Sequence, residues 1–133
     1  MGSLLCGGRG FIEEARRQRK MLGGGVRQGG VVAAAGLVAL EYLPRLGEDH
    51  HKLQVLARGL RELGGRPSEP ETNILLLAVA NPQKAAADLE NAGVRTLPVG
   101  GALRFITHRD LSLEDIAEAL ERMAPCADSL GGG

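Results

Sequence analysis

From Asn73 onward the sequence alternates between strand-like and helix-like segments, and this alternation most restricts the folds that the chain can adopt. The run NILLLAVA at 73–80 is apolar and has the length of a buried strand, and the helix pattern NPQKAAADLENAG follows it. Asn81 is a favoured N-cap residue, Pro82 suits the first helical position, and Gly93 suits a helix end. We therefore predict a strand that leads directly into a helix.

Two further strands and another helix follow this pair. The segment VRTLPVGGALRFITH at 94–108 predicts a hairpin, because its Gly-Gly pair favours the positive φ values of a tight turn. Ser112 and Asp115 have the spacing of a capping box ahead of a helix with an apolar stripe. The order β-α-β-β-α predicts a small, mainly antiparallel sheet with helices over one face. We expect four residues to share its core: Leu76, Phe105, Ile116 and Leu120.

The first half of the chain is of a different kind. A short strand-like run, GSLLC at 2–6, precedes an amphipathic helix at 10–22 and then VVAAAGLVALEYL at 31–43, which is apolar on nearly every side. A second amphipathic helix is predicted at 48–63. A helix that is apolar all round needs cover from the rest of a structure. In this chain alone we expect an exposed apolar patch that includes Val31, Val32, Leu37 and Leu40.

Charge and cysteine content argue against several classes of function. Sixteen basic residues balance sixteen acidic ones, so no net charge attracts nucleic acid or an anionic membrane. The longest apolar run, 31–40, is about half as long as a bilayer span, and no basic region precedes an apolar one at the N-terminus. Cys6 and Cys126 lack neighbours at metal-ligand spacing, so we predict no metal site and a reducing compartment.

Arg104 is an unexpected residue in its strand. Alternation places Leu103, Phe105 and Thr107 on one face, and Arg104 with Ile106 on the other. An arginine in that position has three ordinary explanations, which are an exposed sheet face, a structural ion pair, and a grip on an anionic ligand. Periodicity alone does not choose among them.

The glycine-rich stretch GGGVRQGG at 23–30 brackets Arg27 and would let backbone N–H groups approach a ligand closely. It has neither the Walker spacing nor the GxGxxG order, so alone it is more typical of a flexible connector than of an anion site. His50 and His51 have no catalytic or metal-binding partner at helical spacing and are expected to face solvent.

Two segments carry a resemblance to a known family. ARRQRKMLGGGVRQGGVVAAAGLVALE at 15–41 and LRFITHRDLS at 103–112 resemble the low-specificity L-threonine aldolases, which are fold-type-I enzymes that use pyridoxal 5′-phosphate (PLP). The paired signatures KMLGGGVRQ and R-x-x-T-H-x-D are more specific together than either is alone. The resemblance extends from Gly2 to about Met123.

The resemblance implies an α/β fold that corresponds to the C-terminal part of a PLP-dependent, aspartate aminotransferase-like enzyme. Residues 1–44 would be a remnant of the large PLP-binding domain with its linking helix. Residues 45–124 would be the small domain, with a mainly antiparallel sheet. Apart from the resemblance, we expect the tail at 125–133 to be disordered.

The family cleaves L-threonine and L-allo-threonine to glycine and acetaldehyde. The resemblance implies that Arg104 binds the α-carboxylate of the amino-acid substrate and that Arg27 lies near the phosphate of the cofactor PLP. It further implies a homo-oligomer. We expect a cytoplasmic location, with the mitochondrion as the alternative.

The resemblance also implies that part of the catalytic apparatus is missing. Family members carry the Schiff-base lysine shortly before a PVGS motif, and this chain begins just ahead of Gly2. Lys20, Lys52 and Lys84 lie on the polar side or flank of predicted helices, with nothing to lower their pKa for imine chemistry. We expect a truncated aldolase-like protein with no catalytic residue, which neither holds PLP nor cleaves threonine by itself. The alternative is a non-catalytic small-molecule-binding or interaction module, because β-α-β-β-α is most of the split βαβ arrangement.

Overall fold

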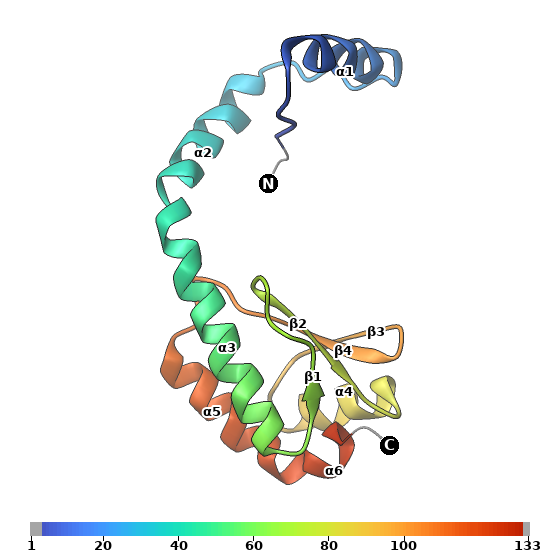
Figure 1. Cartoon of the computed structure of the whole chain (residues 1–133), viewed down its shortest axis with the longest axis vertical. Helices are drawn as coiled ribbons and strands as arrows, with labels where there is room; N and C mark the ends of the chain where they lie inside the picture. Colours follow the sequence, from blue (N-terminus) through green and yellow to red (C-terminus); the bar gives the residue numbers. More distant parts are fainter. Residues whose placement is uncertain (1–3, 132–133) are drawn as a thin grey trace. The chain divides into compact units, whose positions relative to one another are not determined.

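The computed structural model describes residues 4–131, whose helices and strands are shown in Figure 1. The chain divides into two compact units, Met1–Pro44 and Arg45–Gly133.

The first unit contains the helices α1 (Arg9–Met21) and α2 (Gly29–Glu41), and the short 3-10 helix η1 (Leu43–Arg45) begins at its end. Neither α1 nor α2 contains a buried residue. The strand predicted at 2–6 is wrong for residues 4–6, which form no strand, and its first two residues lie outside the described part. The predicted apolar patch on α2 is confirmed as exposed, with Val31 at 76%, Val32 at 53%, Leu37 at 66% and Leu40 at 47%.

The second unit is built around one sheet. Its elements, in chain order, are α3 (Leu46–Glu62), β1 (Arg66–Pro67), β2 (Ile74–Ala78), α4 (Pro82–Asn91), β3 (Leu97–Val99), β4 (Ala102–Ile106), α5 (Leu113–Met123), η2 (Ala124–Cys126) and α6 (Ala127–Leu130). The strands lie in the order β1-β2-β4-β3, and every neighbouring pair is antiparallel. This confirms the predicted antiparallel sheet. The two-residue strand β1 was not predicted, because a segment that short shows no periodicity.

The core lies between one face of the sheet and the helices α3, α4 and α5 (Figure 1). Alternate residues of β2 and β4 point toward these helices and are buried: Leu75, Leu77, Leu103 and Phe105. Ile116 is buried as predicted, and Leu120 packs against the core while partly exposed. Leu76 is a correction. It is 42% exposed, because the period of two places it on the opposite face from Leu75 and Leu77.

The predicted caps of two helices are present. The side chain of Asn81 accepts a hydrogen bond from the backbone N–H of Lys84 at 3.0 Å, with Pro82 at the first helical position of α4. Ser112 and Asp115 form a reciprocal capping box at the start of α5. The backbone N–H of Ser112 donates to the Asp115 carboxylate at 2.7 Å, which holds the pKa of that carboxyl below its usual value.

The disordered tail predicted at 125–133 is wrong for residues 125–131; the last two residues lie outside the described part. Helix α6 ends in Leu130, whose side chain is completely buried, and Gly131 forms an isolated antiparallel bridge with Gly65. The hydroxyl of Ser129 donates to Asp88 Oδ2 at 2.6 Å and ties α6 to α4. This segment therefore completes the core of the second unit.

Helices α3 and α5 pack closely at Gly59, and replacing this residue should destabilise the second unit. A Cβ at position 59 would lie 2.9 Å from Leu120 Cγ and closer still to its methyl carbons. Overpacking of this kind costs about 1–3 kcal/mol, of which the better helix propensity of alanine offsets up to about 1 kcal/mol. We expect Gly59→Ala to lower the urea midpoint.

The matched control for this variant is Gly47→Ala, because Gly47 lies in the same helix and a Cβ there would meet no atom within 4 Å. The control should be neutral or slightly stabilising. Equal midpoints for the two variants would show that α3 and α5 are not packed closely at Gly59.

Candidate functional site

The candidate site is the face of the sheet that the helices leave open, with Arg104 near its middle. Arg104 is the third residue of β4, and its chain neighbours Leu103 and Phe105 are buried against the helices. Its side chain therefore projects from the opposite face. Across the sheet it is paired with Leu76 in β2 and with Leu97 in β3.

The guanidinium of Arg104 is unpaired within residues 4–131. It takes part in no ion pair or side-chain hydrogen bond there, and its Nε is buried without a partner. A buried donor that makes no hydrogen bond costs about 1–3 kcal/mol. The sequence left three explanations for Arg104, and one of them, a structural ion pair, is not found in the described part. The role of Arg104 as a carboxylate-binding residue stays a prediction.

Apolar side chains surround Arg104 on this open face. Five of them are between 41% and 50% exposed: Ile74, Leu76, Leu97, Val99 and Ile106. Pairing across the strands places Ile74 beside Ile106, and Val99 beside Ala102. An unpaired cation among apolar side chains interacts more strongly with an anion than it would in open water, because the local dielectric constant is lower. The arrangement thus suits a small anion with apolar substituents.

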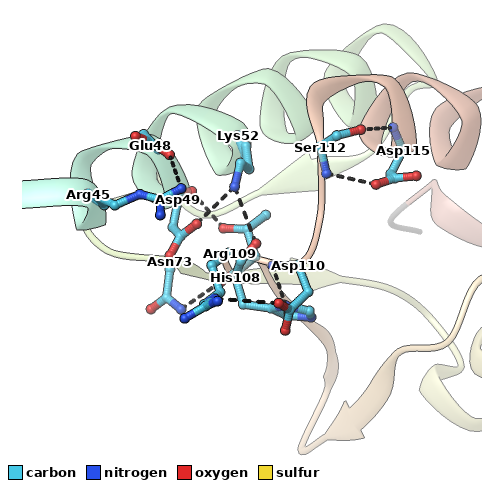
Figure 2. Close-up of polar contacts among 11 residues, drawn as sticks. Arg45, Glu48, Asp49, Lys52, Asn73, His108, Arg109, Asp110, Ser112 and Asp115 are labelled. Atoms are coloured by element: carbon cyan, nitrogen blue, oxygen red, sulfur yellow. Dashed lines mark hydrogen bonds and ion pairs between the residues drawn. The ribbon is translucent and has the colours of Figure 1, made fainter. Parts of the chain in front are cut away.

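Side-chain hydrogen bonds converge on the end of β4 and the residues just after it. Thr107 is completely buried and donates to the carbonyl oxygen of Asp49 at 2.7 Å. Lys52, which is only 8% exposed, binds Asp49 Oδ1 at 3.0 Å and the carbonyl oxygen of His108 at 3.3 Å. Figure 2 shows these contacts between the start of α3 and the segment after β4. This cluster was not predicted from the sequence.

Arg27 lies in the first unit, in the glycine-rich connection between α1 and α2. Its side chain is exposed. The next residue, Gln28, adopts a left-handed conformation with φ 53°. Its side chain does not cap α2, so it accepts no hydrogen bond from the first backbone N–H groups of that helix. A cation beside such a helix start suits an anion. Its predicted role near a phosphate stays a prediction.

None of the three lysines is arranged for imine formation with PLP. Lys20 is exposed on α1, and Lys84 pairs with Asp88 at 3.0 Å on the surface. Lys52 is buried but engaged by Asp49 and the His108 carbonyl. The described residues therefore offer a cation for a phosphate at Arg27, but they do not fit covalent attachment of the cofactor.

Metal sites and membrane-spanning helices are two further classes of feature to consider in the described part. No cluster of three or more His, Cys, Asp or Glu side chains that could hold a metal ion occurs there. No single helix in it is long and apolar enough to cross a bilayer. Helix α2 and the segment Leu43–Glu62 reach the required length and apolar composition only when they are taken together as a bent pair.

Comparison with known sequences gives a consistent result. A family model described as beta-eliminating lyase matches residues 1–82. The low-specificity L-threonine aldolase of Escherichia coli K12 is 42% identical over 121 residues, which are 89% of this chain and 36% of that protein. Low-specificity L-threonine aldolase 1 of Arabidopsis thaliana is 36% identical over 126 residues, which are 87% of this chain and 35% of that protein. The chain thus spans about a third of the length of these relatives.

Comparison with solved structures supports the fold. A thermostable omega transaminase variant is similar with a TM-score of 0.64 and 22% identity, covering 88% of this chain and 32% of that chain. A likeness at this identity bears on the fold alone. The predicted fold class, part of a PLP-dependent transferase-like α/β fold with a mainly antiparallel small-domain sheet, is confirmed.

Proposed function

Because the chain belongs to the beta-eliminating lyase family, we propose that its second unit binds the α-carboxylate of an L-threonine-like 3-hydroxy amino acid. The observation that carries this proposal is the unpaired guanidinium of Arg104 on the open face of the sheet. The chain matches about a third of each aldolase to which it is similar, so the cleavage reaction is proposed for a complete enzyme of the family.

The geometry of Arg104 determines how a carboxylate could bind. Its Nε is buried and closed to a ligand. Neither Nη atom is both buried and without a hydrogen-bond partner. A carboxylate would therefore accept hydrogen bonds from the two Nη groups in a forked arrangement. Binding of this kind orients an amino acid about its Cα, which is what cleavage of the Cα–Cβ bond requires of the protein.

PLP would supply the electron sink for this cleavage in the complete enzyme. Arg27 and the start of α2 are proposed to lie near its phosphate, because they combine an exposed guanidinium with N–H groups of a helix start. We further propose that these 133 residues alone do not catalyse the reaction, because none of their lysines is arranged for attachment of the cofactor.

A titration with carboxylates tests the binding proposal. Acetate and L-allo-threonine should shift the Nε–H resonance of Arg104 and the neighbouring amides of β2 and β4 saturably, with a Kd on the order of 1–10 mM. Arg104→Lys keeps the charge but loses the planar fork, so its affinity should fall at least about tenfold.

Arg95→Lys is the matched control, because the Arg95 side chain is 89% exposed and lies outside the strands. It should bind acetate as the unmodified chain does. Shifts that grow linearly with acetate in every variant, or equal affinities for Arg104→Lys and Arg95→Lys, would contradict the assignment of Arg104.

A further inference from the structure

We propose that Thr96 and the Thr107–Asp49–Lys52 network are positioning elements that hold the main chain of β4 so that Arg104 can bind its ligand. This inference rests on the proposed carboxylate site. It concerns residues outside that site, since Thr107 and Lys52 lie on the helix-covered side of the sheet and Thr96 precedes β3.

The first contact is at Arg104 itself. The hydroxyl of Thr96 donates to the carbonyl oxygen of Arg104 at 2.8 Å. Thr96 stands just before β3, which begins at Leu97. A side chain, rather than only the backbone ladder, thus fixes the peptide group that follows the Arg104 Cα. The direction of the Arg104 Cα–Cβ bond depends on that peptide group.

The second set of contacts lies three and four residues further along. The Asn73 side-chain amide donates to the Thr107 carbonyl oxygen at 2.8 Å, and Lys52 Nζ donates to the His108 carbonyl oxygen at 3.3 Å. Thr107 completes the link through its own bond to the Asp49 carbonyl oxygen at 2.7 Å. Figure 2 shows how Asp49, Lys52 and Asn73 surround the segment at His108. Three carbonyl groups between 104 and 108 therefore accept side-chain hydrogen bonds.

The chemistry of these residues favours positioning over simple stabilisation. Thr107 is completely buried and Lys52 is 8% exposed, and they are the two buried polar residues of the described part. Well-packed apolar residues in such places are often as stabilising as a buried ion pair, whereas polar partners fix one register of the chain. A bidentate site needs its donors held to within about 0.5 Å, so a fixed register benefits Arg104 directly.

The experiment compares Thr96→Val and Thr107→Val with the serine variants at both positions. Valine removes the hydroxyl and keeps the shape, whereas serine restores the hydroxyl. The control is Thr72→Val, because the Thr72 hydroxyl accepts a hydrogen bond from the backbone N–H of Ile74 at the start of β2 and makes no hydrogen bond to β4 among the described residues. Three quantities are measured, namely the Kd for acetate, the hydrogen-exchange rate of the Arg104 Nε–H, and the urea midpoint.

We expect each valine variant to weaken acetate binding about five- to tenfold and to speed exchange of the Arg104 Nε–H at least about threefold. The serine variants should lie within about twofold of the unmodified chain, and Thr72→Val should be unchanged. Folded valine variants that keep both the Kd and the exchange rate would overturn the proposal, even if their urea midpoints fall.

Two outcomes separate this proposal from the carboxylate site on which it rests. If the unmodified chain does not bind acetate, the carboxylate site fails, and the exchange rate alone decides whether Arg104 is positioned. If Thr107→Val does not fold, Thr96→Val decides, because Thr96 is half-buried and its loss should leave the core intact.

Discussion

Purified chain supplied with PLP and L-allo-threonine should release acetaldehyde no faster than PLP does alone. Cleavage requires that the substrate and the electron sink are held together in reacting geometry, which is worth about 7–11 kcal/mol. We propose that Arg104 orients the carboxylate, whereas Lys20 and Lys84 lie on the surface and Lys52 is engaged by Asp49, so we expect none of them to hold the cofactor in reacting geometry. Without this contribution the activation barrier would be at least about 7 kcal/mol higher, so the rate should be at least about 10⁵-fold below that of a complete enzyme.

The release of acetaldehyde is measured with a coupled dehydrogenase assay, with PLP alone and with the Arg104→Lys chain as references. All three samples should give the same rate. Turnover that is abolished by replacing a single lysine would contradict this prediction and would identify that lysine as a catalytic residue.

Replacing Leu130 with alanine should lower the free energy of unfolding of the second unit by about 2–5 kcal/mol. Leu130 ends α6, its side chain is completely buried, and it belongs to the main core. The cost combines the lost transfer of apolar surface with the cavity left between the surrounding core residues. Urea unfolding followed by circular dichroism measures it.

Leu113→Ala is the matched control, because Leu113 is the same residue type but is 43% exposed at the start of α5. The control should cost well under half as much as Leu130→Ala. Equal small costs for the two variants would mean that the segment 124–131 does not pack on the core.

Periodicity and capping signals predicted much of the second unit. The strand at β2, the hairpin of β3 and β4, and the caps at Asn81 and Ser112 depend on local sequence and are present. Leu76 was misplaced because the run of apolar residues in β2 has no polar residue to mark its exposed face. Leu130 was missed because one leucine among glycine and serine has no period, and its burial depends on residues far away in the sequence.

The candidate site could be predicted only in part. Arg104 was identifiable because a charge interrupts an apolar strand. Its unpaired state does not follow from periodicity, because pairing depends on which side chains β2 and β3 bring beside it. The Thr107 network was missed although a signal exists. Alternation placed Thr107 on the same face as Leu103 and Phe105, and a buried hydroxyl there requires a partner.

We propose that these residues supply a carboxylate-binding arginine but no lysine that carries the cofactor. Incubation with PLP, reduction with borohydride and peptide mass spectrometry measure which lysines form an imine. We expect only sparse labelling, spread over the exposed Lys20 and Lys84, with Lys52 unlabelled because Asp49 and the His108 carbonyl engage it. Stoichiometric labelling of one lysine would show instead that this chain holds PLP at a defined position.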